Sequence, residues 1–401
     1  MPTFDWIVVG NGLTGAALSY ELSRLGLSVL LIDKAVAPKN ATRYSYGGVP
    51  HWSGDSELLR QLYRASVARY AALPEETGVD SHYRELDLLL TVEPDQDPLQ
   101  LAERYAQVEA PPTPISVDEA IAIEPLLNPT AIAGALTVRH GHVDSTALVN
   151  AYNQGLQLRG GQIIIAQVTG LVRVGDRITG VTTPAQAYAA GQVAIAAGGL
   201  TRGLIKTVGI KVPVYFSHAE LVETSPLEIS LHSLVMPADL SRSAIEAEST
   251  SEDGNQIWDE PDREIRPPFL DAGCVQLIDR RLRIGQISRI NTSLEPDFDA
   301  ERGERRIRDG ITKLLPALKA VPGAWHSCRV AFSQDGLPLA GAIPGVKNGY
   351  VFSGFTSPFG LVPAAAVHFA QWASTGQADQ IMAATSPDRF MVNSESAMKS
   401  L

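Results

Sequence analysis

The N-terminal segment combines short apolar runs with a helical pattern. Residues 6–9 (WIVV) are apolar without alternation, which is typical of a parallel strand covered on both faces. Leu18, Leu22 and Leu25 then recur at helical spacing, and a second apolar run extends from Ser28 to Ile32. The pattern predicts a strand, a helix and a second buried strand, in this order.

A glycine motif with the spacing G-x-G-x-x-G joins the first strand to the helix. Gly10 permits a tight turn, Gly12 lets a pyrophosphate approach the backbone, and Gly15 lets the helix pack closely on the strand. Asp33 ends the second strand, where a carboxylate can accept hydrogen bonds from a ribose, and Lys34 follows it. These five residues are predicted to bind the ADP part of a dinucleotide, with NAD and FAD both open at this point.

Beyond this unit the chain does not continue as further short strand-helix pairs. Residues 37–54 are rich in Gly, Asn, Ser and aromatic side chains and predict a loop, and a helix is predicted from about 55 to 73. The alternating run 85–92 predicts an antiparallel strand, whereas 98–108 and 116–125 read as helical. This part is predicted to be a second domain that is inserted early.

The nucleotide-binding pattern then resumes. Ser145 is predicted to cap a helix, a strand follows at 162–168, and residues 175–176 form the turn of a meander. Residues 192–199 are a buried strand that ends in small residues, which would let a cofactor lie close to the backbone.

Alternating strands return between residues 211 and 291. Within them, the acidic and polar stretch 241–264 predicts a loop that serves as a mobile or lid-like connection. A helix with a charged face is predicted over 299–318, and residues 349–375 predict a strand, a glycine-containing loop and a helix. The C-terminal segment is therefore expected to rejoin the nucleotide-binding domain.

The amino-acid composition limits which classes of function are compatible with the sequence. The chain has 401 residues, 45% of them hydrophobic, which is enough to fill the cores of two domains. A net charge of -11 and the lack of a Lys/Arg cluster argue against a nucleic-acid partner, and no apolar stretch reaches the roughly 20 residues of a transmembrane helix. A strand that starts almost at once leaves no room for a signal peptide and predicts the cytoplasm. Cys274 and Cys328 are too few for a disulfide framework or a multi-cysteine zinc site, so no metal is predicted.

Several separated segments resemble the D-amino-acid-oxidase-like FAD oxidoreductases, the group that includes glycine oxidase and monomeric sarcosine oxidase. Their order and spacing carry the resemblance more than any single motif. The segments are GNGLTG…LLIDK (10–34), VDSTALVNAYNQGLQLRGGQII (143–164), AIAAGGLTRGL (194–204), RLRIGQISRI (281–290), SQDGLPLAG (333–341) and GYVFSGFTSPFGLVPAAA (349–366).

The resemblance implies FAD as the cofactor, with its isoalloxazine between two domains. The late return of the chain to the nucleotide-binding domain favours FAD over NAD. The expected fold is mixed α/β (α+β): a discontinuous FAD-binding Rossmann-like domain interleaved with a substrate domain built on an antiparallel sheet. The FAD-binding domain is expected to comprise 1–54, 141–210 and 325–401, and the substrate domain 55–140 and 211–324.

The resemblance also implies contacts with FAD beyond the glycine motif. The family loop that lines the flavin, the adenine contact, the strand end below the pyrophosphate and the isoalloxazine loop all have counterparts here. They are Thr42, Arg43, Val168, Ala197, Gly198, Gly354, Phe355, Phe359 and Gly360. The frequent G-H-G of the family is replaced by residues 357–359 (SPF).

Two residues close to Asp335 are compared with family positions near the flavin. The family arginine that clamps the substrate carboxylate corresponds to Val330, and Arg329 stands one residue early, which turns it to the opposite face unless a bulge corrects the register. Carboxylate binding and pairing with a surface acid are both open for Arg329. Cys328, seven residues before Asp335, matches the cysteine that is thioether-linked to flavin in the monomeric sarcosine oxidase type; the alternative is a small buried hydrophobe.

Further polar residues are candidates for catalysis. Arg283 stands where sarcosine oxidase has a lysine over the flavin, and its positive charge could stabilise superoxide. Arg43 and Tyr46 belong to the flavin loop, and His218 could accept a proton near neutral pH or be structural. Together with Arg329, these residues form the predicted catalytic set.

The predicted function is FAD-dependent oxidation of a C–N bond in a small amine or amino acid, by hydride transfer to flavin N5. Oxygen or another acceptor would then take the electrons. Two alternatives stay open: an FAD-dependent dehydrogenase of a hydroxy acid or alcohol, and a flavin-binding protein without turnover. The sequence predicts neither the substrate nor the oligomeric state.

Overall fold

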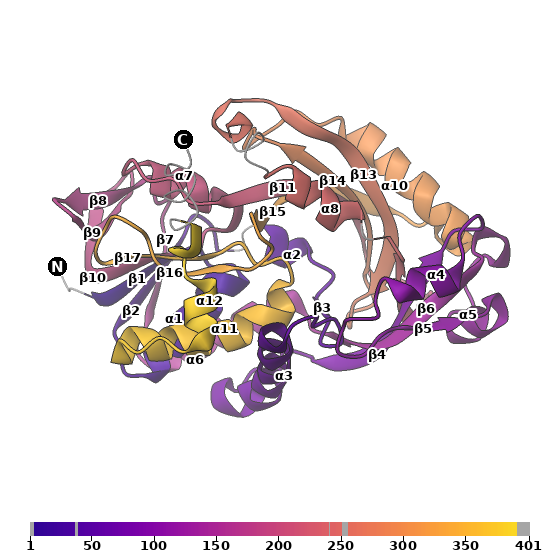
Figure 1. The fold of residues 1–401 in the computed structure, drawn as a ribbon, viewed down its shortest axis with the longest axis horizontal. Coiled ribbons are helices and arrows are strands. Elements are labelled where there is room, and N and C mark those ends of the chain that lie inside the picture. The colour runs from indigo at the N-terminus through magenta and orange to yellow at the C-terminus, as the bar shows by residue number, and fades with distance from the viewer. Residues whose placement is uncertain (1–3, 37–38, 240, 251–255, 391–401) are drawn as a thin grey trace, which may run out of the picture.

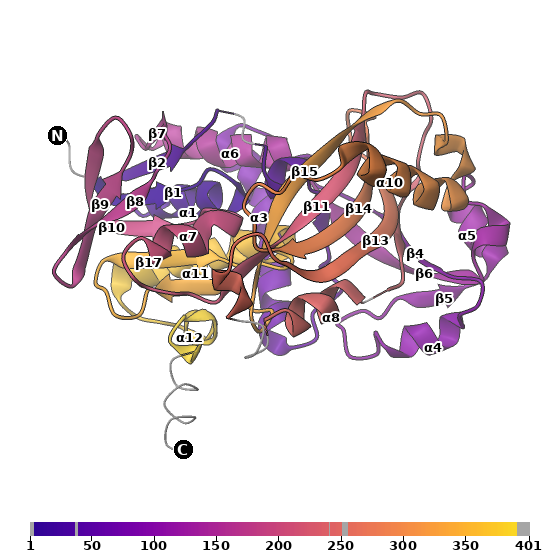
Figure 2. The same cartoon turned by 90° about the horizontal axis from the view of Figure 1, so that it is seen from above.

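The protein consists of two large sheets that lie side by side along its longest axis (Figures 1 and 2). This computed structural model describes residues 4–36, 39–239, 241–250 and 256–390. One sheet, sheet A, has eight strands, and the other, sheet B, has nine. This arrangement confirms the predicted mixed α/β fold with a Rossmann-like sheet and an antiparallel sheet.

Sheet A has the strand order β16-β17-β10-β1-β2-β7, and β9 joins β10 to β8. Its central strands are parallel: β1 pairs with β10 and β2, and β10 pairs with β17. The strands are β1 (Phe4–Val9), β2 (Val29–Asp33), β7 (Gln162–Ile165), β8 (Gly170–Val174), β9 (Arg177–Thr182), β10 (Ala187–Ile195), β16 (Leu339–Ala342) and β17 (Gly349–Ser353).

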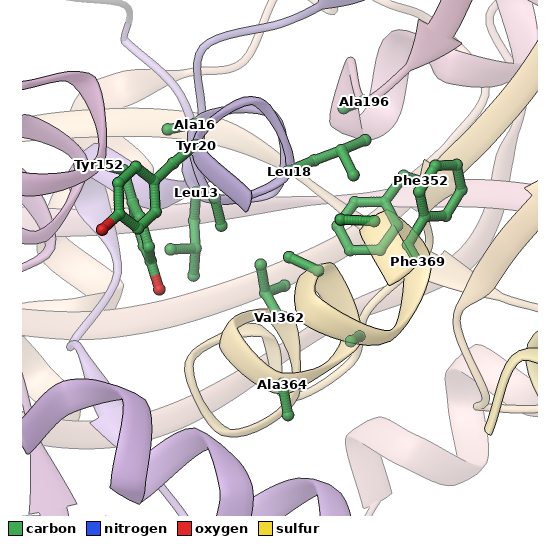
Figure 3. Close-up of a cluster of buried hydrophobic side chains, with 14 of the residues drawn as sticks. Leu13, Ala16, Leu18, Tyr20, Tyr152, Ala196, Phe352, Val362, Ala364 and Phe369 are labelled. Carbon is green, nitrogen blue, oxygen red and sulfur yellow. The ribbon is translucent and has the colours of Figure 1, made fainter. Parts of the chain in front are cut away.

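Both faces of β1 are buried, as its apolar run predicts. Trp6 and Val8 belong to one core and Ile7 and Val9 to another on the opposite face. Helices cover the first face, and Figure 3 shows part of that core, including side chains from the first and the penultimate helix. These helices are α1 (Leu13–Arg24), α3 (Glu57–Thr77), α6 (Ser145–Leu158), α11 (Pro358–Thr375) and α12 (Gln380–Thr385).

Sheet B has the strand order β15-β11-β14-β13-β12-β4-β6-β3, and β5 pairs with β6. All its pairs are antiparallel except β12 with β4. The strands are β3 (Gly48–Val49), β4 (Arg84–Val92), β5 (Thr113–Ile115), β6 (Gly134–His142), β11 (Val214–Thr224), β12 (Ser233–Pro237), β13 (Glu264–Gln276), β14 (Leu282–Asn291) and β15 (Gly323–Ser333).

Sheet B is covered on both faces. On its outer face, Ile307 and Ile311 of α10 (Ala300–Leu314) pack against Val222 and Ile284. On its inner face, α8 (Ser241–Glu248) packs over β11, β13 and β14. The remaining short helices are α2 (Ala41–Tyr44), α4 (Pro98–Glu103), α5 (Val117–Ile123) and α7 (Thr201–Lys206), with 3-10 turns η1 (Pro129–Ala131), η2 (Gly198–Leu200), η3 (Ile257–Asp259) and η4 (Pro316–Leu318).

Several local predictions need correction. The stretch 241–264 is not a loop throughout, because it contains α8 and η3. Ser145 is the first residue of α6; the cap is Asp144, whose carboxylate accepts hydrogen bonds from two backbone N–H groups. Helix α3 extends beyond the predicted end, with Pro74 in its last turn, and stops at Gly78 with φ 74°.

The chain crosses between the two sheets several times. Strand β3 belongs to sheet B although it directly follows the loop after β2, and β15 completes sheet B before β16 and β17 return to sheet A. The domain limits expected from the sequence stay a prediction. Within the described residues, no helix has both the length and the apolar character needed to cross a bilayer.

Candidate cofactor and active site

The turn between β1 and α1 is packed so closely that neither Gly10 nor Gly15 can be replaced without strain. Gly10 has φ +106°, and a Cβ there would lie 2.6 Å from the carbonyl oxygen of Ala196 at the end of β10. A Cβ on Gly15 would lie 1.7 Å from the carbonyl oxygen of Gly10. The first turn of α1 is therefore held directly against the strand ends of sheet A.

Polar groups converge on the start of α1. The backbone N–H of Leu13 donates to Thr42 Oγ1 (3.1 Å), and the backbone N–H of Asn11 donates to Asp33 Oδ2 (2.6 Å). Asn11 is buried, and its side-chain oxygen has no partner among the described residues. A helix N-terminus, a glycine at position 12 and a carboxylate at the end of β2 fit an ADP moiety.

The other residues predicted to contact the ADP part lie around this turn. Ala197 and Gly198 follow β10, and Gly198 has φ +54°. Lys34 is exposed directly after β2, and Val168 is half-buried between β7 and β8. These residues stay predicted contacts.

Glu223, on the inner face of β11, binds three arginines. Arg43 of α2 donates to both of its carboxylate oxygens (2.8 Å each), Arg281 donates at 2.8 Å, and Arg283 donates at 3.0 Å. Burial raises the pKa of Glu223, but the hydrogen bonds and charges of Arg43 and Arg283 outweigh it and lower the pKa to about 2. We call these four residues the Glu223 cluster.

Arg283 is the most buried member of the Glu223 cluster, with 2% of its side chain exposed. It also donates to the carbonyl oxygen of Ser45 and to Ser145 Oγ. Burial lowers its pKa, while Glu223 acts in the opposite direction. The cluster thus ties sheet B to α2 and to the start of α6.

Cys328 lies on the same face of sheet B as the Glu223 cluster. It pairs with Ala219 across β15 and β11, two positions along the strand from the pair His326 and Leu221. The ring of Tyr44 stacks on His326 with a centroid distance of 4.6 Å. Cys328 is a free, buried thiol, and burial raises its pKa to about 12.

Arg329 and His218 lie on the opposite face. They pair with each other across β15 and β11, one residue out of step with Cys328, so their side chains point to the outer face. His218 Nε2 lies 2.9 Å from the carbonyl oxygen of Ser293, and Arg329 donates to the carbonyl oxygen of Leu294. Burial lowers the pKa of His218 to about 4. The structure does not bring this pair to the Glu223 cluster, and the catalytic role of both residues stays a prediction.

Tyr46 lies close to the Glu223 cluster. Its hydroxyl donates to the carbonyl oxygen of Gly273 on β13 (3.1 Å), and burial raises its pKa. The positive charge of Arg283 acts in the opposite direction and lowers the pKa of Tyr46. Of the predicted catalytic residues, the structure therefore brings together Arg43, Tyr46 and Arg283.

The C-terminal loop between β17 and α11 is fixed by the core. Gly354 has φ +78°, Phe355 packs on Phe352 with a centroid distance of 4.9 Å, and the carbonyl oxygen of Phe359 accepts a hydrogen bond from Tyr70 (2.6 Å). A Cβ on Gly360 would lie 2.3 Å from the ring of Tyr63. These contacts fix the loop in place, and its role beside the isoalloxazine stays a prediction.

Sequence reasoning missed several polar residues of the inner face. Glu223 carried no motif, and only its alternation with Leu221 along a strand could have placed it on the inner face. His140 and His142 in the run RHGH alternate in the same way, and this spacing could have signalled two histidines on one face. Arg84 pairs with His142 across β4 and β6 and carried no sequence signal.

Comparisons with known proteins identify relatives of this chain. Mitochondrial dimethylglycine dehydrogenase of Mus musculus is 25% identical over 412 residues, which cover 96% of this chain and 44% of that protein. One component of the anaerobic glycerol-3-phosphate dehydrogenase of Escherichia coli (strain K12) is 30% identical over 189 residues, covering 44% of this chain and 33% of that protein. The chain thus spans less than half the length of these curated relatives.

A solved structure covers nearly the whole chain. Glycine oxidase from Geobacillus kaustophilus superposes with a TM-score of 0.78 at 21% identity, covering 96% of this chain and 98% of that one, which shows a shared fold. The family model described as FAD dependent oxidoreductase (DAO) matches residues 5–372. The chain therefore belongs to the DAO family of FAD-dependent oxidoreductases, whose cofactor is FAD.

Proposed function

We propose that this protein oxidises a C–N bond of a small amine or amino acid and passes the electrons to oxygen or another acceptor. The observation that carries the proposal is the Glu223 cluster on the inner face of sheet B, which includes the buried Arg283 and lies next to the predicted flavin loop that contains Arg43. The name of the dimethylglycine dehydrogenase, which matches 96% of the chain, supports an amine. Bound FAD would supply the hydride acceptor.

The Glu223 cluster would stabilise negative charge. Arg43, Arg281 and Arg283 share one carboxylate, and Arg281 also pairs with Asp279 at 2.6 Å, so three guanidinium groups face two carboxylates. One positive charge is left in excess. Since a guanidinium does not readily give up its proton, the cluster would act as a fixed charge and not as an acid or base.

Anaerobic titration of the flavin-loaded protein tests this proposal. We expect a panel of amines and amino acids to include a compound that bleaches the oxidised flavin absorbance, while matched hydroxy acids and alcohols do not. Hydrogen peroxide formation, compared with reduction of a dye, then identifies the electron acceptor.

The similarity to the anaerobic glycerol-3-phosphate dehydrogenase favours a second candidate, dehydrogenation of an alcohol. Bleaching by alcohols or hydroxy acids, with none by amines, would replace the first proposal with this one. If neither class reduces the flavin, the remaining candidate is a flavin-binding protein without turnover.

Cys328 is proposed as the covalent attachment point of the flavin. Its position on the inner face beside Tyr44 supports the proposal. Its raised pKa opposes it, because the thiolate is the form that reacts. We expect acid precipitation to leave the yellow colour in the protein pellet, and Cys328→Ser to release it into the supernatant. Cys274→Ser, at the other buried free cysteine, is the matched control. Complete release from the unmodified protein would exclude the linkage.

A further inference from the structure

The inner face of sheet B carries a second buried polar group, which we call the Arg84 patch: Arg84, His140 and His142. Arg84 on β4 pairs directly with His142 on β6, and His140 lies two residues away on the same face. His142 has 1% of its surface exposed and His140 has 5%. None of these residues belongs to the Glu223 cluster or to the predicted cofactor contacts.

The Arg84 patch contains hydrogen-bond donors without acceptors. His140 Nδ1 accepts a hydrogen bond from Trp52 Nε1 (3.0 Å), and burial lowers the pKa of His140 to about 3, so its ring is neutral and Nε2 carries the proton. This Nε2, Arg84 Nε and both ring nitrogens of His142, one a donor and one an acceptor, have no partner with full hydrogen-bond geometry in the described part of the chain; a weaker interaction of the His142 ring with the Tyr46 backbone acts to raise its pKa. Each buried donor left unpaired costs about 1–3 kcal/mol, which a bound acceptor would recover.

The Arg84 patch is also positively charged. Among the described residues no carboxylate forms an ion pair with Arg84, whose Nη2 donates only to the carbonyl oxygen of Gln276 (2.5 Å). Burial lowers the pKa of Arg84, and burial followed by the charges of Arg84 and Arg283 lowers that of His142. The preferred ligand is therefore an anion with several acceptor atoms.

A cavity of about 280 Å³ gives access to Arg84, whereas His140 and His142 are not among its lining residues. It opens beside the start of β12, where Ser233 is level with Asp87 of β4 and β4 continues beyond it to Arg84. Glu85 and Asp87 also line the cavity, but both pair with Arg139. The volume suits a small organic acid and not a nucleotide.

We propose that the Arg84 patch binds a carboxylate group, with Arg84 and His142 as its donors. The carboxylate belongs either to the amine substrate or to a separate small organic acid. The first source rests on the proposed amine oxidation; the second does not. In the substrate case Arg84 would take the place of the arginine that the family has at Val330, approaching from β4 instead of β15.

Thermal unfolding of the flavin-loaded protein tests for binding. Acetate, glycolate and succinate are added at constant ionic strength, with chloride as the reference salt. We expect a saturable rise in Tm for at least one carboxylate, since a ligand of the folded state stabilises it. Arg84→Gln should weaken this binding at least tenfold. Arg173→Gln, which removes an exposed arginine of β8 in sheet A, should change it less than twofold.

A second readout separates binding from a structural role. If Arg84 served only to hold Gln276, Arg84→Gln would lower the Tm measured without added carboxylate. If Arg84 serves to bind a ligand, Arg84→Gln should leave this Tm unchanged or raise it. If Arg84→Gln does not fold, His142→Asn takes its place, and this variant must weaken carboxylate binding as well. Equal binding by the variants and the unmodified protein, or no saturable stabilisation at all, overturns the proposal.

Kinetics then identify the source of the carboxylate. A higher KM of Arg84→Gln for amino acids, with an unchanged KM for the corresponding amines without a carboxylate, assigns the site to the substrate. Carboxylates that bind at Arg84 without competing with the amine assign it to a separate organic acid. Carboxylate binding in a protein whose flavin no amine reduces would refute amine oxidation and leave the site intact.

Discussion

Gly15→Ala is expected to abolish flavin binding and to leave little stably folded protein. The added Cβ would lie 1.7 Å from the carbonyl oxygen of Gly10, a backbone atom that is itself fixed against β10. No flexible side chain can move aside, so the strain should exceed the roughly 1–3 kcal/mol typical of overpacked sites. The soluble yield, the flavin content of the purified protein and its urea unfolding curve measure the effect.

Gly203→Ala is the matched control. Gly203 lies inside α7, and a Cβ there meets no atom within 4 Å. Alanine should therefore stabilise the protein by about 0.5–1 kcal/mol, because glycine is the poorer helix former. Normal flavin content and stability in Gly15→Ala would show that the turn between β1 and α1 is not packed as described.

Glu223→Gln should lower the free energy of unfolding by about 3 kcal/mol. The amide cannot neutralise Arg283, which would remain a buried charge without its carboxylate, and removing one partner of a buried ion pair costs about this much. Chemical unfolding in urea measures the change. Glu85→Gln, which alters an exposed carboxylate, should cost about 0–1 kcal/mol.

The same variant should change the pH dependence of stability. The pKa of Glu223 is lowered from 4.5 to about 2 in the folded protein, so its stabilising contribution is present above the unfolded value and is lost as pH falls through the folded value. The free energy of unfolding should fall less steeply between about pH 5 and pH 2 in Glu223→Gln than in the unmodified protein. Identical slopes would show that Glu223 is not the ionised centre of the cluster.

The sequence predicted the parts of the fold that depend on local patterns. The apolar run of β1 and the spacing of Gly10 and Gly15 belong to one contiguous strand-helix unit. Residues that are neighbours in the sequence were therefore enough to predict this unit. Strand β12 was not foreseen as a distinct element, because its parallel pairing with β4 joins residues far apart in the chain. Helix α8 was missed because its polar and acidic composition resembles a loop, while its burial comes from packing on sheet B.

The candidate site was predictable to a similar extent. Alternation along a strand was enough to foresee that Cys328 and Arg329 point to opposite faces, which the register confirms. Neither composition nor spacing could show that Glu223 gathers arginines from α2 and β14, because these contacts depend on how the two sheets meet. Likewise, only the folded structure can show that the ring nitrogens of His142 lack hydrogen-bond partners.

The repeated crossing of the chain between the sheets has a consequence for biosynthesis. The central strand β10 needs β17 as its neighbour, and β11 needs β15, although each partner is synthesised about 100 residues later or more. Neither sheet can close on the ribosome while these partners are missing, and both β10 and β11 would expose a hydrogen-bonding edge during that time. The nascent chain should therefore depend on chaperones until its last strands emerge, and capture of FAD should be a late event in its folding.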